Sequence, residues 1–305
     1  MRWTPGGESN DIEDDRDQGG GGGGGGGFNF GGMHLGIGGF LLLLVLSLIF
    51  KRNFLSLAGF GTQSGAPTTQ MSRPEQTGRP DAPRERGPET PQDKAEEPVV
   101  QFVSFVLDDV QKTWTQILSQ QGVSYRHAKL VLFRNRINSA CGLAQAASGP
   151  FYCPQDQKVY IDLSFFDELR TRFGAPGQFA EAYVLAHELG HHVQKLTGIE
   201  EKVHAAQERN PQQGNQLSVM LELQADCFAG VWGHTTDERK LLDPGEVNEG
   251  LKAAAAVGDD RLQRQSGRTV NPETFTHGSS EQRMSWFQKG FTTGDMKQCN
   301  TFASN

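Results

Sequence analysis

The stretch that decides the fold runs from Phe179 to Gln194 and reads FAEAYVLAHELGHHVQ. It is largely apolar, its spacing is helical, and it contains His-Glu-x-x-His. Residues four apart lie one above the other on a helix face, so His187 and His191 can direct imidazole nitrogens at one metal ion. Glu188 is rotated by about 100° around the helix, which places it beside the ion as a base for a water molecule.

Two histidines do not complete a zinc site, because catalytic zinc usually has three protein ligands and one position left for water. The extended motif with a third histidine fails here, since Gln194 and Thr197 stand where it needs glycine and histidine. The next candidate is ELQAD, residues 222–226, in a second stretch with helical spacing. We expect Glu222 to be the third ligand. Asp226, on the same helix face, is expected to accept the free N–H of a liganding imidazole.

Other interpretations of these residues stay open at this point. The motif can arise by chance, although unpaired polar groups on a buried helix cost free energy that metal binding would remove. Glu222 and Asp226 can be a solvated charge pair, and His204 or His234 can be the third ligand instead. His192 points away from its neighbour His191, so we expect a structural role for it.

The composition separates a low-complexity first third from an ordinary globular remainder. The 36 acidic and 29 basic residues give a net charge of −7, which argues against a nucleic-acid partner bound through a basic surface. Residues 1–32 combine acids with the glycine run 19–27, which predicts a disordered tail. Residues 51–98 are rich in Pro, Gly, Thr and Gln, which predicts an extended linker. The globular domain is then residues 99–305.

An apolar segment at residues 33–50 contains no Asp, Glu, Lys or Arg. Because a bilayer core needs about 17–25 apolar residues, we expect one uncleaved transmembrane helix here. A cleaved secretory signal is the alternative, but the region before such a signal is short and basic rather than long and acidic. Lys51 and Arg52 favour a cytoplasmic location for the residues after the segment, although long domains cross membranes largely regardless of charge.

Helix signals outnumber strand signals in the globular part, which predicts an α+β domain with a small sheet and an active-site helix. The expected strands are residues 128–133 and a hairpin at 151–163. The expected helices are residues 99–119, 178–196, 215–232, 245–257 and 279–288.

The four cysteines form an even set. Cys141 and Cys153 are 12 residues apart around an expected turn, and a bridge from Cys227 to Cys299 would tie the chain end to the second of the two helices. Four cysteines allow three pairings, and four reduced thiols in a cytosolic domain are the alternative. Because disulfides persist in oxidising compartments, we expect the domain to lie outside the cytoplasm.

The sequence His187-Glu188-Leu-Gly-His191, followed by Glu222 and Asp226, resembles the glutamate-zincin pattern of thermolysin-like peptidases. The bacterial family of neutral zinc metallopeptidases is closer still, and the resemblance extends over roughly residues 99–300. The segments that carry it are Cys141-Gly142, Gly149–Pro154, Val159–Asp162, His187–His192, Glu222–Trp232 and Thr276–Arg283. The resemblance implies a zincin-like fold and a membrane-anchored peptidase that uses Zn²⁺.

In such an enzyme, zinc activates a water molecule and Glu188 acts as the general base. The oxyanion needs a further donor, for which we expect His277, just before an expected helix start. A histidine there without a catalytic role is the alternative, and Tyr152 and Tyr160 are weaker candidates. The strand at 159–163 can be a sheet edge that pairs with an extended peptide.

The expected function is hydrolysis of peptide or protein substrates by a single-pass protein of the bacterial cell membrane, held there by residues 33–50. One alternative is a non-catalytic envelope protein with a structural zinc site. Another is a zinc amidase that acts on non-peptide amides, because the motif specifies activated water rather than the substrate.

Overall fold

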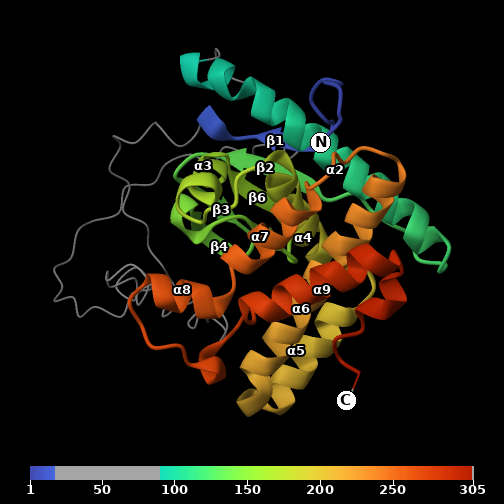
Figure 1. Ribbon diagram of the computed structural model, residues 1–305, viewed down its shortest axis with the longest axis vertical. Coiled ribbons are helices and arrows are strands. Elements are labelled where there is room, and N and C mark those ends of the chain that lie inside the picture. Colours follow the sequence, from blue (N-terminus) through green and yellow to red (C-terminus); the bar gives the residue numbers. More distant parts are fainter. Residues whose placement is uncertain (18–89, 304–305) are drawn as a thin grey trace, which may run out of the picture. The chain divides into compact units, whose positions relative to one another are not determined.

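The computed structural model describes residues 1–17 and 90–303 (Figure 1), and the predicted span at 33–50 lies outside them. Within these two ranges, none of the helices combines the length and the apolar character needed to cross a bilayer. The described residues form an α+β unit, as expected. Its helices are α2 (Pro91–Ser119), α3 (Ser164–Thr171), α4 (Gln178–Leu196), α5 (Ile199–Arg209), α6 (Gly214–Glu238), α7 (Val247–Ala256), α8 (Asp259–Gln265) and α9 (Ser280–Thr293).

The main sheet has four strands in the order β1-β2-β6-β5. They are β1 (Ile12–Asp14), β2 (Lys129–Phe133), β5 (Phe151–Cys153) and β6 (Lys158–Asp162), and β3 (Arg136–Ser139) pairs separately with β4 (Gly142–Gln145). β2 runs parallel to both β1 and β6, whereas β5 and β6 form the expected antiparallel hairpin. The strand expected as an edge, β6, is therefore internal, and the edges of the sheet are β1 and β5. The prediction of a free edge is therefore wrong for residues 158–160, which are paired on both sides, whereas Ile161 and Asp162 are paired with β2 alone.

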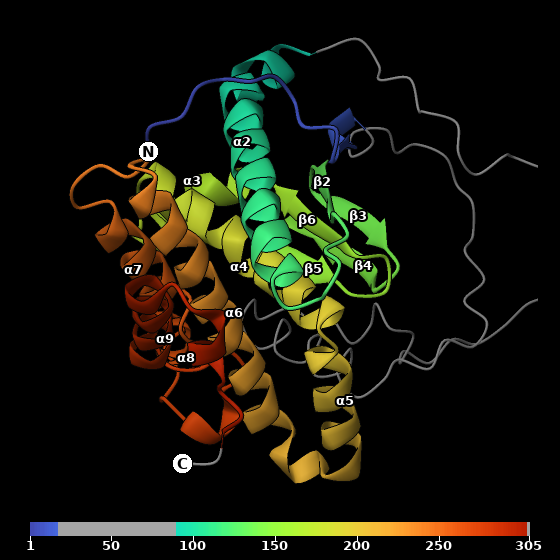
Figure 2. The same ribbon diagram turned by 90° about the vertical axis from the view of Figure 1, so that its right-hand side faces the viewer.

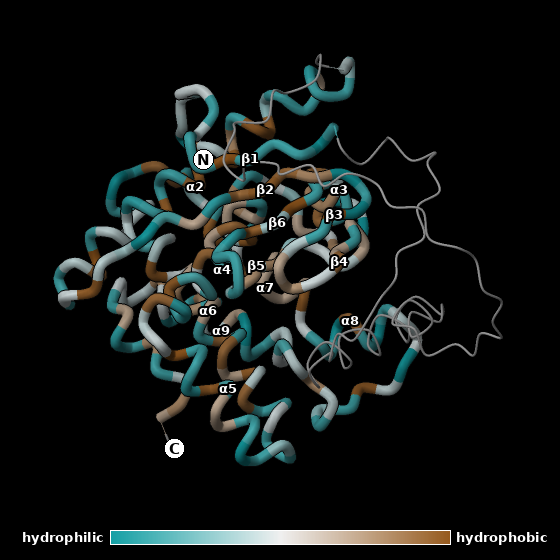
Figure 3. Tube along the Cα trace, turned by 180° about the vertical axis from the view of Figure 1, so that it is seen from behind, coloured by the Kyte–Doolittle hydropathy of each residue, from teal (hydrophilic) through white to brown (hydrophobic). Residues whose placement is uncertain are grey.

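The two faces of β2 bury different sets of side chains, as strand geometry requires. Leu130 and Leu132 join the main core with residues of α2 and α4, whereas Val131 and Phe133 belong to a second, smaller cluster with Tyr160. Figure 3 shows hydrophobic residues along β2 and β6 and mainly hydrophilic residues along α5. Burial on both faces explains why β2 reads as a continuous apolar run rather than an alternating one.

Residues 1–17 differ from the disordered tail that we expected for residues 1–32. β1 pairs with β2 in the register Ile12 to Leu130, and the Trp3 ring lies 5.4 Å from the Phe102 ring of α2. Arg16 is buried between carboxylates, including Glu96 of α2 at 2.8 Å. The acids that suggested disorder are thus partly engaged in contacts with the domain, while residues 18–32 lie outside the described ranges.

The folded domain also begins earlier than the expected boundary at residue 99. α2 starts at Pro91 behind Thr90, whose side chain and that of Asp93 form a reciprocal capping box. Proline at the first helical position and a capping threonine are favourable helix starts. The prediction of a linker over 51–98 is therefore wrong for residues 90–98, where proline begins a helix rather than preventing one.

The helices that carry the candidate site pack on one another at two close approaches. Figure 2 shows α6, α7 and α9 grouped on the side of the domain away from β3 and β4. A Cβ atom on Gly290 of α9 would lie 1.9 Å from the Cys227 carbonyl oxygen of α6, and one on Gly230 would lie 2.1 Å from the Phe287 carbonyl oxygen. The two helix backbones can therefore meet only because both positions are glycine.

Candidate metal centre

The helix predicted at residues 178–196 is α4, and it presents the His-Glu-x-x-His motif to α6. Gly190 lies at the closest approach, where an added Cβ would stand 3.1 Å from the Ala225 backbone of α6. A larger residue at position 190 would push α6 away. The glycine inside the motif therefore brings the carboxylates of Glu222 and Asp226 within reach of the imidazoles.

The three predicted ligands lie together. Glu222 Oε2 is 3.2 Å from His187 Nε2, and Glu222 Oε1 is 3.5 Å from His191 Nε2. One ligand atom from each residue lies within 4.8 Å of the other two. Tetrahedral zinc with bonds of about 2.1 Å holds its ligand atoms about 3.4 Å apart, so the spacing in this triad suits a zinc ion.

Each imidazole turns its other nitrogen to an acceptor. His187 Nδ1 lies 2.9 Å from Asp226 Oδ1, and His191 Nδ1 lies 2.8 Å from Gln194 Oε1. A carboxylate and an amide oxygen only accept, so both Nδ1 atoms carry the proton. Both Nε2 atoms therefore face Glu222, which is the side on which a metal ion would displace their protons and be bound.

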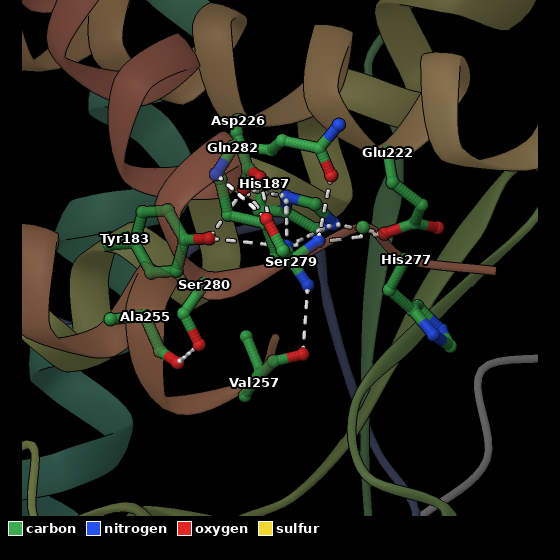
Figure 4. Close-up of polar contacts among 12 residues, drawn as sticks. Tyr183, His187, Glu222, Asp226, Ala255, Val257, His277, Ser279, Ser280 and Gln282 are labelled. Atoms are coloured by element: carbon green, nitrogen blue, oxygen red, sulfur yellow. Dashed lines mark hydrogen bonds and ion pairs between the residues drawn. The ribbon is translucent and has the colours of Figure 1, made fainter. Parts of the chain in front are cut away.

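Asp226 is fully buried and receives four hydrogen bonds (Figure 4). Besides His187, the donors are Tyr183 Oη at 2.5 Å and Arg283 of α9, through Nε at 2.8 Å and Nη2 at 2.9 Å. The sequence placed Asp226 beside a liganding imidazole, and the structure brings it there. The roles of Tyr183 and Arg283 were missed, because no local pattern marks a contact between α4 and α9.

The electrostatics of the triad favour a cation. Burial lowers the pKa of His187, but the Asp226 and Glu222 carboxylates outweigh burial and raise it to about 10. Burial works against ionisation of Glu222, yet the positive charges of His191 and His277 hold the pKa of Glu222 well below its usual range. The carboxylates that stabilise the protonated imidazoles would stabilise a divalent cation in the same way. Metal binding displaces the protons on the ligand nitrogens.

Glu188 stands apart from these contacts. It follows His187 on α4 and is partly exposed. In the described ranges, its carboxylate makes no hydrogen bond or ion pair, and its charge acts on the neighbouring His191. A carboxylate without a fixed donor is free to exchange protons with a water molecule at the site.

His277 lies in the loop before α9, next to Glu222 in Figure 4. Its Nδ1 is 3.3 Å from Asp259 Oδ1, and Asp259 Oδ2 accepts hydrogen bonds from the backbone N–H groups of Thr276, His277 and Gly278. Gly278 has φ of +90°, a conformation that favours glycine. Asp259 therefore holds the whole loop in place, and this role was not anticipated from the sequence.

The remaining candidate residues lie elsewhere. His204 pairs with Glu200, and His234 contacts Glu238, so neither joins the triad. His192 Nδ1 is 2.9 Å from the Tyr152 hydroxyl and its Nε2 is 2.6 Å from the Arg126 carbonyl oxygen, which agrees with the expected structural role. The Tyr160 hydroxyl donates to Asp156.

Both expected disulfides are confirmed. Cys141 is bonded to Cys153, which ties the β3–β4 hairpin to the edge strand β5. Cys227, the residue after Asp226 in α6, is bonded to Cys299 at the end of a short 3₁₀ helix, Met296–Cys299. The second bridge therefore holds the C-terminal segment against the helix that supplies Glu222.

The arrangement of the three candidate ligands is typical of one class of zinc protein. Two histidines one turn apart on one helix, with a glutamate from a following helix, form the donor set that thermolysin-type zinc peptidases use. The chain belongs to the family described as "Putative neutral zinc metallopeptidase", whose model matches residues 1–302. The match covers the predicted resemblance over residues 99–300 and extends to the N-terminal residues.

Several relatives are similar over much of their length. The chain is 44% identical to the uncharacterized protein YpfJ of Escherichia coli K12 over the full length of both chains. It is 42% identical to the uncharacterized proteins Mb2605 of Mycobacterium bovis and Rv2575 of Mycobacterium tuberculosis, across 65% of this chain and 68% of each relative. No solved structure matches the chain.

Proposed function

We propose that this protein is a zinc-dependent peptidase. The observation that carries the proposal is the convergence of His187 Nε2, His191 Nε2 and the Glu222 carboxylate, with both Nδ1 atoms engaged behind them. Zinc held by these residues supplies Lewis acidity, which lowers the pKa of a water molecule towards about 7 and polarises a carbonyl.

The chain's own groups then move the protons. Glu188, one residue after the first ligand, accepts the proton of the attacking water and passes it to the leaving amine. His277 donates to the oxyanion that develops on the substrate carbonyl, and Asp259 orients its imidazole and its loop. A peptide substrate suits this chemistry because its leaving amine needs a proton as the C–N bond breaks.

The location of the enzyme is part of the same proposal. Two disulfides support an oxidising compartment and therefore a site of action outside the cytoplasm. Attachment to the bacterial membrane through residues 33–50 remains a prediction from the sequence, since that segment lies outside the described residues.

The test is Glu188→Gln in the full chain. The substitution keeps the shape of the side chain and removes the base, so we expect zinc content equal to wild type and hydrolysis of a peptide library reduced by at least about 10²-fold. Glu181→Gln is the matched control, because Glu181 lies on the same helix two turns earlier, and its activity should stay near wild type. A zinc-loaded wild type that cleaves no peptide would refute the peptidase and leave a structural zinc site or an amidase.

A further inference from the structure

A series of hydrogen bonds connects His191, the second predicted metal ligand, to Cys299 in the C-terminal segment. His191 Nδ1 is bonded to Gln194 Oε1 at 2.8 Å, and Gln194 Nε2 donates to Gln224 Oε1 at 3.1 Å. Gln224 Nε2 in turn donates to the Cys299 carbonyl oxygen at 2.9 Å. Both glutamines are buried, and the contacts link α4, α6 and the C-terminal segment.

The Cys299 carbonyl determines which group donates and which accepts in each hydrogen bond of this series. A backbone carbonyl can only accept, so Cys299 requires the NH₂ group of Gln224, which turns the Gln224 oxygen towards Gln194. Gln194 must then present its own NH₂ group, which also donates to the Leu221 carbonyl oxygen at 2.8 Å. With its donors committed, Gln194 can offer His191 only an oxygen.

A flipped Gln194 amide would place its oxygen against two other acceptors, the Leu221 carbonyl and Gln224 Oε1, inside the protein. Buried polar groups left without partners are destabilising, so this alternative is strongly disfavoured. Nδ1 of His191 is therefore held as a hydrogen-bond donor, and Nε2 of the ring faces Glu222.

We propose that Gln194 and Gln224 are positioning residues for His191, and that the Cys227–Cys299 disulfide holds the carbonyl that orients Gln224, which together with the Leu221 carbonyl orients Gln194. The bridge joins Cys299 to the residue that follows Asp226 in α6. Thr301 adds a second tie, because its hydroxyl donates to the Met220 carbonyl oxygen of α6 at 2.7 Å. Zinc affinity thus depends on a C-terminal segment that contributes no ligand. The inference rests on the proposed zinc site.

The test measures the zinc dissociation constant by competition with a chelator of known affinity. Gln194→Leu removes the acceptor and should weaken zinc binding about 10–100-fold, the usual effect of losing an outer partner of a ligating histidine. Gln224→Leu should weaken it less, since the Leu221 carbonyl still orients Gln194. The control is Gln111→Leu: Gln111 is equally buried and bonded to Asp11 and Ala128, and its loss should leave the zinc constant unchanged.

Gln194→Glu separates positioning from general damage to the fold. A carboxylate still accepts from His191 but cannot donate to Leu221, so this variant should be less stable than wild type and yet bind zinc more tightly than Gln194→Leu. The visible absorption of the Co²⁺-substituted protein should change in Gln194→Leu and stay close to wild type in Gln194→Glu. Zinc constants within twofold of wild type in Gln194→Leu would overturn the proposal for the glutamines.

The disulfide has its own matched pair of variants. Cys227→Ser with Cys299→Ser should weaken zinc binding several-fold, whereas Cys141→Ser with Cys153→Ser should leave the zinc constant unchanged. Equal constants in both double variants would overturn the role of the C-terminal segment. Failure of the proposed function would look different, because the wild type itself would then bind no zinc or cleave no peptide.

Discussion

Replacement of Arg283 by methionine tests the buried charge network behind the candidate metal centre. The substitution keeps an unbranched apolar stem and removes the charged guanidinium. The Arg283 guanidinium makes two hydrogen bonds to Asp226, at 2.8 and 2.9 Å, and neither side chain is appreciably exposed. The variant therefore leaves the Asp226 carboxylate buried beside Tyr183 and His187 without its main counter-charge.

The size of the effect follows from that burial. Breaking a buried ion pair by removing one partner costs about 3–5 kcal/mol, because the remaining charge is uncompensated. For a domain of this size, each kcal/mol lowers the melting temperature by about 2–4 °C, so Arg283→Met should melt about 6–20 °C below wild type. The melting curve should be followed by circular dichroism, with chelator present so that zinc does not mask the difference.

The control is Arg264→Met. Arg264 also pairs with an aspartate, Asp260, but its side chain is 60% exposed, and exposed pairs contribute at most about 1 kcal/mol. Adding Asp226→Asn to Arg283→Met should recover part of the loss, since the isolated charge disappears. Melting temperatures that fall equally in Arg283→Met and Arg264→Met would refute the reasoning.

Three further predictions concern catalysis, pH and packing. His277→Ala should lower kcat about 10²–10³-fold while leaving the zinc dissociation constant unchanged, and an equal loss of zinc would instead make His277 a ligand. Burial lowers the pKa of His192 to about 4, so from about pH 6.5 down to 4 the unfolded chain binds a proton that the folded protein does not. The free energy of unfolding measured in urea should fall by about 3 kcal/mol across that pH range, and His192→Gln should reduce this dependence on pH. Gly290→Ala should destabilise the fold severely because its Cβ would meet the Cys227 carbonyl, whereas Gly214→Ala, with open space around it, should melt at or above the wild-type temperature.

The sequence was most informative where structure depends on local periodicity. The bounds of α4 are those predicted, 178–196, since one helix carries both the apolar face and the His-Glu-x-x-His spacing. Glu222 was found by the same logic, because residues four apart, such as Glu222 and Asp226, share a face only when they lie on a helix. The hairpin of β5 and β6 was also found, since its turn is short and polar.

The features that could not be predicted depend on contacts between distant parts of the chain. β1 is a three-residue strand with two acids, and only its pairing with β2 makes it a strand. α3, α5 and α8 are short or polar helices whose pattern is weak without their neighbours. The contact of Arg283 with Asp226 joins residues 57 apart, and no local rule relates them.

The pairing of β1 with β2 has a consequence for membrane topology. Hydrogen-bonded strands share one aqueous compartment, so the residues just before position 18 and just after position 89 emerge on the same side of any bilayer as the metal centre. The ion pair of the buried Arg16 with Glu96 of α2 adds a second contact between these two parts of the chain. The sheet therefore requires residues 17 and 90 to be delivered to the same compartment before β1 can pair with β2.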